Sequence, residues 1–69
     1  MIVLCSELKL YDVFSWTAGV DLFTVISTPQ DEFDPHLGRT KIRFRIFHPR
    51  FLKTYPMVVF PEEEVRLIE

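Results

Sequence analysis

The stretch Lys41-Ile42-Arg43-Phe44-Arg45-Ile46-Phe47 decides the fold class of this chain. Basic and apolar residues alternate along it with a period of two. In an antiparallel strand with one buried face, such alternation directs Ile42, Phe44 and Ile46 into a core and the three cations to solvent or to a ligand. We therefore predict a β-strand over Lys41–Phe47 with one basic face.

Basic residues gather in the centre of the chain. The stretch from Pro35 to Pro61 contains no acid and holds most of the eight Lys and Arg residues, whereas the ten acids lie before and after it. The net charge of -2 at pH 7 therefore hides a bipolar distribution. We predict an electropositive contact face formed by Arg39, Lys41, Arg43, Arg45, Arg50 and Lys53.

Four further segments are predicted as strands because apolar and β-branched residues concentrate in them and turn residues bound them. They are Leu8–Trp16, Leu22–Thr28, Tyr55–Phe60 and Val65–Ile68, with turns at Thr17–Asp21, Pro29–Thr40, His48–Thr54 and Pro61–Glu64. A change of phase at Val13-Phe14 predicts a bend or bulge. Pro56 favours an edge position for its strand, and Pro61 followed by three acids favours a tight helical turn before the last strand.

Five short strands predict an all-β antiparallel meander, a single domain over residues 1–69. A chain of this length buries only about 60% of its unfolded surface, so its core must be small. The one cysteine, Cys5, lies in an apolar run and forms no disulfide within the chain. Closure into a small barrel would remove exposed sheet edges, and a strongly bent meander is the alternative.

The layout resembles the SH3-like small barrels, in which a helical turn commonly separates the last two of five strands. The segment Leu8–Phe14 resembles their opening strand, and Pro61–Ile68 resembles their closing turn and strand. Leu10-Tyr11-Asp12 is similar to the aromatic signature of signalling SH3 domains, but no paired tryptophans follow to complete a groove for proline-rich peptides. The resemblance implies a fold and a tendency towards binding roles, and it names no ligand.

The basic strand suggests three roles. Alternate residues stand about 6.6 to 6.8 Å apart, so the cations could follow a phosphate backbone, with Trp16, Phe51 or Tyr55 as stacking or apolar contacts. They could instead bind an acidic protein partner, or form a solvated face that discourages aggregation. The sequence pI of about 5.6 argues against general nucleic-acid affinity.

A protein partner is favoured over nucleic acid, which is kept as the alternative. Hydrophobic residues make up 48% of the chain, and we expect part of this apolar surface to stay exposed for a partner or for self-association. Docking of Glu62–Glu64 onto the basic face of another copy is one form of self-association. The predicted function is a non-catalytic interaction module.

Catalytic, metal and membrane functions find little support. Cys5, His36 and His48 stand in no nucleophile motif, so no enzyme, cofactor or small-molecule substrate is predicted. The loop Asp31–His36 gathers three carboxylates and an imidazole, but its spacing fits no calcium or zinc motif, and we expect no metal. The long connection Pro29–Thr40 is a candidate second, acidic contact surface. No signal peptide or membrane span is recognised, and we expect a cytoplasmic protein.

Overall fold

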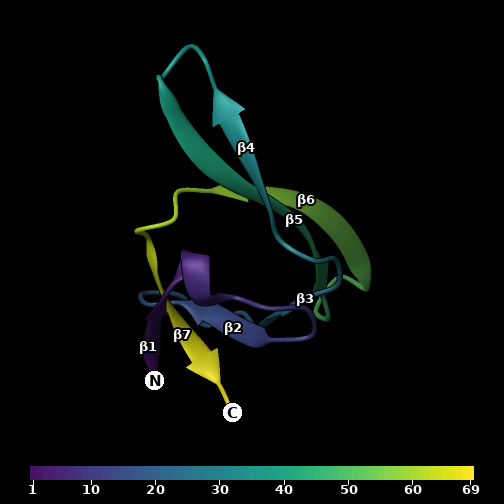
Figure 1. Cartoon of the computed structure of the whole chain (residues 1–69). Helices are drawn as coiled ribbons and strands as arrows, with labels where there is room; N and C mark the ends of the chain where they lie inside the picture. Colours follow the sequence, from purple (N-terminus) through teal and green to yellow (C-terminus); the bar gives the residue numbers. More distant parts are fainter.

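The computed structural model describes all residues from 1 to 69, and nearly all of its regular structure is strand (Figure 1). The strands are β1 (Ile2–Leu4), β2 (Val13–Trp16), β3 (Phe23–Val25), β4 (Gln30–Asp34), β5 (Arg39–His48), β6 (Lys53–Val59) and β7 (Glu64–Ile68). A short 3-10 helix, η1, covers Cys5–Glu7, and no helix is long and apolar enough to cross a membrane. The all-β antiparallel class is confirmed, and the expected count of five strands is wrong.

One antiparallel sheet contains all the strands, with β5 at its centre. Its order is β1-β7-β2-β3-β5-β4, and β6 also pairs with β5. Ile42 and Arg43 pair with both β4 and β6, while Ile46 pairs with both β3 and β6. Strands β3 and β4 therefore follow one another along one side of β5, and β6 lies along the other side.

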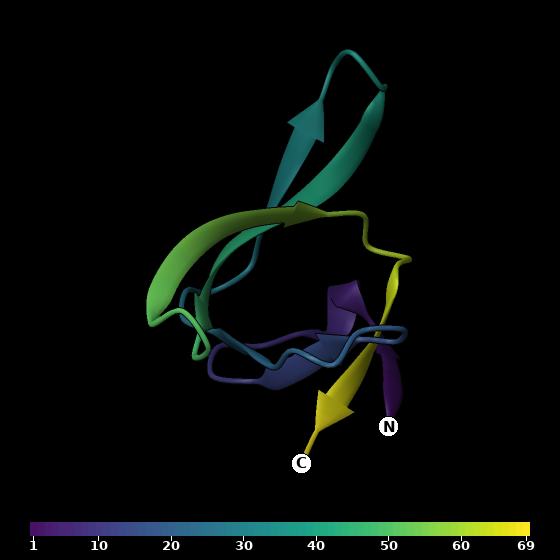
Figure 2. The ribbon, with the colours of Figure 1, turned by 180° about the vertical axis from the view of Figure 1, so that it is seen from behind.

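The sheet curls around its interior without closing. Figure 2 shows β6 arching over the interior, opposite β1, β2 and β7. Strand β7 pairs with β2 on one side and with β1 on the other, so it has no free edge for β6. The prediction of a closed barrel is wrong because the N-terminal strand, which the sequence reading left out, occupies the position that closure requires.

The first predicted strand, Leu8–Trp16, is shorter than expected. Only Val13–Trp16 forms a strand, and Tyr11 before it has φ of 72°, in the left-handed region. The Tyr11 N–H donates to the Val25 carbonyl at 2.7 Å, and the Lys9 N–H donates to Oδ2 of Asp12 at 2.8 Å. These bonds hold a turn at Leu10-Tyr11, whereas the bend or bulge predicted at Val13-Phe14 is absent because both residues lie in β2 and pair in regular register with β7.

The helical turn expected at Pro61–Glu64 is absent, and the structure has a hydrogen-bonded turn there instead. The Phe60 N–H donates to Oε2 of Glu63 at 2.8 Å, and β7 begins at Glu64. The Cys5 N–H donates to the Glu63 carbonyl at 2.7 Å, and the Ser6 N–H to the Pro61 carbonyl at 3.1 Å. The backbone groups of this segment therefore bind the N-terminal 3-10 helix rather than forming a helix of their own.

The core lies on the concave side of the sheet. Phe14 and Phe44 are buried at its centre, with ring centroids 6.2 Å apart in an edge-to-face arrangement. The predicted alternation along β5 is confirmed, because Ile42, Phe44 and Ile46 are buried while Arg43 and Arg45 are exposed. The remaining buried apolar residues are Cys5, Leu8, Val25, Val59 and Val65.

Strands β4 and β5 form a hairpin arm that projects from the curled sheet (Figure 1). The expected loop Pro29–Thr40 is thus mostly a strand and a tight turn. Oδ1 of Asp34 accepts the N–H groups of His36 and Leu37, and Gly38 completes the turn with φ of 64°. A residue with a side chain is disfavoured at that φ, which explains glycine there.

Candidate binding groove

The predicted basic residues are divided between two faces of the sheet. Arg39, Lys41, Arg43 and Arg45 occupy alternate positions of β5 on its outer face, as predicted. Lys53 pairs across the strands with His48, which is buried, so it lies on the opposite face from Arg45.

Acids from the same chain neutralise three of the four cations of this row. Across the strands, Glu32 stands opposite Lys41, and Asp34 stands opposite Arg39. Nζ of Lys41 lies 2.8 Å from Oδ2 of Asp34, and Nη2 of Arg43 lies 3.0 Å from Oε2 of Glu32.

Arg39 pairs with Glu62 from the turn before β7, and its guanidinium lies 4.0 Å from the ring centroid of Phe60. Glu62, which the sequence offered as a contact to another copy, is therefore bound within its own chain. The bipolar charge distribution of the sequence becomes a set of ion pairs in the fold, two across the β4–β5 hairpin and one to the turn before β7.

Two of these pairs lower the pKa of their acids. The hydrogen bond from Lys41 is the main cause of a pKa of Asp34 below its ordinary value. The hydrogen bond from Arg39 likewise lowers the pKa of Glu62. Both carboxylates therefore stay charged to a lower pH than an ordinary Asp or Glu, and they neutralise their cations over that wider range.

Arg45 ends the row and has no acidic partner. Strand β4 begins at Gln30, opposite Arg43, so no residue of β4 reaches the position beside Arg45. The backbone N–H of Arg45 donates instead to Oγ of Ser27 at 2.7 Å. Its guanidinium Nη2 donates to Oγ1 of Thr54 at 3.1 Å and forms no ion pair.

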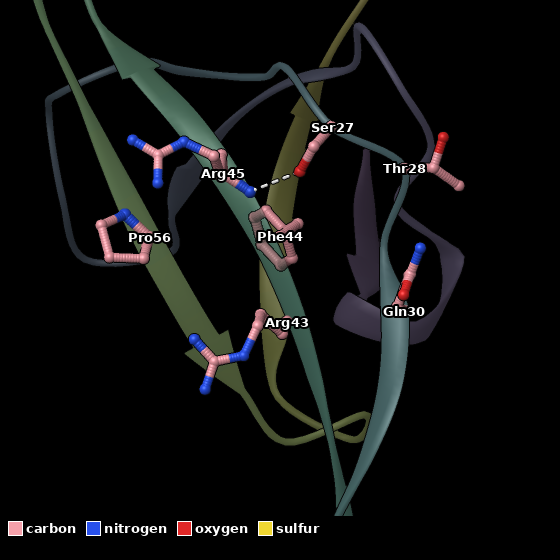
Figure 3. A pocket seen from close by; sticks show the side chains of 7 residues that line it. All are labelled: Ser27, Thr28, Gln30, Arg43, Phe44, Arg45 and Pro56. Atoms are coloured by element: carbon pink, nitrogen blue, oxygen red, sulfur yellow. Dashed lines mark hydrogen bonds between the residues drawn. The ribbon is translucent and has the colours of Figure 1, made fainter.

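A groove of about 450 Å³ lies at this end of the row (Figure 3). The figure shows Ser27, Thr28 and Gln30 on one side of β5 and Pro56 of β6 on the other, with Arg43 and Arg45 coming from β5 itself. The lining is completed by Phe44. The lining residues carry two guanidinium groups, two hydroxyls and an amide, and none of them carries a carboxylate, although Arg43 is paired with Glu32 from outside the lining. Such a donor set suits an oxyanion.

The residues proposed for stacking do not gather at this groove. Trp16 is partly buried and packs edge to face on Phe14, with centroids 6.1 Å apart. Phe51 lies 4.8 Å and Tyr55 6.5 Å from the His48 ring, between centroids. Tyr55 pairs across the strands with Ile46, which is buried, so it faces away from the side of Arg45.

Arg50 belongs to a separate cluster at the end of β5. Its Nη1 lies 3.5 Å from Oδ1 of Asp21, and Oδ2 of the same carboxylate lies 3.5 Å from Nε2 of His48. Asp21 thereby links the loop before β3 to the turn between β5 and β6. Arg50 is a bridge between loops and does not extend the basic row.

The sequence reading missed the polar half of the groove. Ser27, Thr28 and Gln30 fall between or at the start of strands, where no motif marks them. The Ser-Thr-Pro run at 27–29 is the available signal, because it breaks the strand and places hydroxyls beside the basic residues of β5. No three His, Cys, Asp or Glu side chains come together as a metal site requires.

Comparison with protein-family models, curated proteins and solved structures finds no match to this chain.

Proposed function

We propose that the protein is a non-catalytic interaction module that binds an acidic segment of a partner protein in the groove around Arg45. The observation that carries this proposal is the lack of any carboxylate partner for Arg45 in a groove lined by hydroxyl, amide and guanidinium donors. An Arg in such a place gains a charge-assisted hydrogen bond when a carboxylate enters.

A protein partner is favoured over nucleic acid by the distribution of free charge. Binding to a phosphate backbone draws its affinity from many simultaneous cation contacts. Here Arg39, Lys41 and Arg43 already hold carboxylates, so a nucleic acid would have to compete with them. A short acidic segment needs only one or two free donors. Single-stranded nucleic acid is the alternative that the experiment below tests.

Strand order supports a resemblance to the SH3-like layout. Taken together, β3 and β4 form one interrupted strand along β5, so the chain runs as a meander from β2 to β6 and returns through β7 to pair with β2. This is the strand order expected of an SH3-like meander, without closure and with an added N-terminal strand. We propose that the protein is an open variant of that layout. Cytoplasmic placement stays a prediction.

Self-association is a second form of the proposal. Tyr11, Val20 and Leu52 are each at least 74% exposed, and large apolar side chains on the surface are often covered by a partner. Light scattering over a range of protein concentrations tests this form. A mass that rises with concentration would show that a second copy binds the apolar surface. A constant monomer mass would contradict self-association, and the partner would then be a different protein.

The groove is tested by fluorescence anisotropy with a labelled peptide of ten glutamates and a labelled single-stranded oligonucleotide. At about 50 mM salt we expect the peptide to bind and the affinity to fall at about 200 mM. Arg45→Glu should weaken peptide binding at least tenfold, whereas Lys9→Glu, the same charge change outside the groove, should change it little. Preferential binding of the oligonucleotide would favour the alternative, and no binding of either probe would refute both.

A further inference from the structure

The sheet has three open edges, at β1, β4 and β6, because each of these strands pairs on one side only. Unpaired N–H and C=O groups along a sheet edge are a template for an additional strand. Natural edges are commonly blocked by proline, by charge or by a capping group. The three edges of this sheet differ in whether such a block is present.

Two of the edges are blocked. On β1, the N–H of Leu4 donates to Oε2 of Glu7 at 2.7 Å, so the side chain already occupies an outward donor. On β6, Pro56 stands at the middle of the strand and has no N–H. Its partner Arg45 directs its backbone groups to Ile26 and Ser27 on the far side, so Pro56 faces the free edge.

The edge of β4 carries acidic side chains, but no proline within the strand and no capping group occupy its outward backbone groups. Along β5, the backbone groups of successive residues point alternately to its two sides. Those of Arg45 point to the side of β3 and β4, so those of Arg39, Lys41 and Arg43 point to the same side and pair with β4. The N–H and C=O groups of Asp31 and Phe33 must then point away from β5, into solvent. This edge lies on the projecting arm, where no other element of the fold covers it (Figure 1).

Two exposed side chains define what would pair there. The Phe33 side chain stands on the same face as Asp31 and is 62% exposed, although Phe is among the residues most often fully buried. Asp31 has no cation partner, unlike Glu32 and Asp34. A second copy of β4 would bring three acids against three, so its own charge opposes pairing of two β4 edges.

We propose that the β4 edge accepts an extended segment of a partner protein, with an apolar residue opposite Phe33 and a basic residue opposite Asp31. The segment adds a strand beside β4 and pairs its backbone with the N–H and C=O groups of Asp31 and Phe33. Because cross-strand neighbours share a face, the two recognised residues of the segment are two positions apart. This surface differs in charge and place from the Arg45 groove, and the two can be occupied independently.

The probe is the peptide acetyl-Thr-Val-Thr-Lys-Thr-Val-Thr-amide, which offers the required spacing in either strand direction. Its matched control has Glu in place of Lys. In a titration followed by amide NMR signals, we expect saturable shifts centred on Asp31 and Phe33, slower hydrogen exchange at both amides, and at least tenfold weaker binding of the control. Shifts confined to other residues, or equal binding of the Glu peptide, would overturn the proposal.

Asp31→Pro tests the backbone contribution. Its N–H does not pair with β5, so proline at this edge position leaves the β4–β5 ladder in place while removing an outward donor. We expect at least tenfold weaker peptide binding, and a severalfold loss in Asp31→Asn, which keeps the N–H but not the charge. Undiminished binding to Asp31→Pro would contradict strand addition.

A second measurement uses the unmodified protein, in case Asp31→Pro disturbs the arm. Two versions of the peptide are methylated at every second backbone nitrogen, one at the odd positions and one at the even positions. Each version thereby lacks the N–H donors along one edge of the peptide strand. One of them should lose at least tenfold in affinity and the other should bind nearly as the parent. Equal binding by both would refute backbone pairing. Arg45→Glu should leave all these affinities unchanged, so failure here is distinct from failure of the groove.

Discussion

Glu32 holds Arg43 through two hydrogen bonds, from Nε to Oε1 at 3.1 Å and from Nη2 to Oε2 at 3.0 Å. This bond to Glu32 also raises the pKa of the arginine. The pair spans two neighbouring strands and lies beside the groove, so it fixes one wall and removes half of the positive charge that the two arginines would present. The groove therefore has one free cation, Arg45, and one that an incoming anion must share with Glu32.

Removal of this carboxylate charge should strengthen anion binding. In Glu32→Gln, Arg43 loses its charged partner, and we expect the labelled glutamate peptide to bind severalfold more tightly at about 50 mM salt. Glu64→Gln makes the same charge change on β7 and serves as the control. An increase no larger than that of the control would mean that Arg43 takes no part in the groove.

Asp34 should make stability depend on pH in the acid range. Its pKa in the folded protein is lowered below the unfolded value of about 3.9, so its contribution is present above about pH 4 and is lost as the pH falls through the folded pKa. Asp34→Asn keeps an oxygen to accept the turn N–H groups but lacks the charge. In urea unfolding, we expect the difference in unfolding free energy between wild type and this variant to shrink below pH 4. If the difference in unfolding free energy is constant with pH, it arises from the hydrogen bonds of the turn and not from the charge of Asp34.

The alternation along β5 was readable because it depends only on local period and burial. Ile42, Phe44 and Ile46 are buried as the pattern predicts, and Pro56 lies on an edge strand for the reason the sequence suggests. The sequence did not show that the acids of residues 31–34 lie in a strand or which cations they pair with. The segment 30–34 is polar, with proline on either side, and this composition is typical of a loop.

Two of the three acids of β4, Glu32 and Asp34, form ion pairs with cations across the hairpin, which favours a strand there. That pairing is a non-local property, so a composition-based reading separates the charges that the fold brings together. For the same reason, the sequence did not show on which face of the sheet Tyr55 and Lys53 lie, because this depends on the register of β6 against β5. The same limit applied to the open sheet, since the place of β1 beside β7 depends on partners from 60 to 64 residues away in sequence.

Cys5 should be chemically inert in the folded protein. Burial, with a smaller effect from Glu63, raises the pKa of its thiol to about 11, so very little thiolate forms at pH 8. We expect a disulfide reagent to modify the native protein at least a hundredfold more slowly than the urea-unfolded chain. The folded protein holds the thiol proton more tightly than the unfolded chain does, so the unfolding free energy gains a contribution that is complete below the pKa of the unfolded chain. This contribution should be lost as the pH rises from about 9 to about 11. Rapid modification of the native protein would show that the N-terminal segment opens.

Truncation of two phenylalanines should destabilise the protein to very different extents. Phe44 is 2% exposed at the centre of the core, and Phe44→Ala should cost about 3 to 5 kcal/mol, enough to unfold much of so small a domain. Phe33, on the arm, is 62% exposed, and Phe33→Ala should change the unfolding free energy by less than about 0.5 kcal/mol. Thermal unfolding of both variants measures the contrast. A large loss in Phe33→Ala would mean that the arm is packed in solution.

Leu52 should be the site of a stabilising substitution. It stands in the turn between β5 and β6 with φ of 53°, in the left-handed region, and is 78% exposed. The strain of this backbone conformation is therefore not offset by burial of the side chain. That conformation costs a residue with a β-carbon about 1 to 2 kcal/mol. Leu52→Asn, which tolerates the region, should raise the unfolding free energy by about 0.5 to 1 kcal/mol, whereas Leu52→Ala keeps the penalty and should not. Equal effects of the two in urea unfolding would attribute the change to the loss of the leucine side chain rather than to backbone strain.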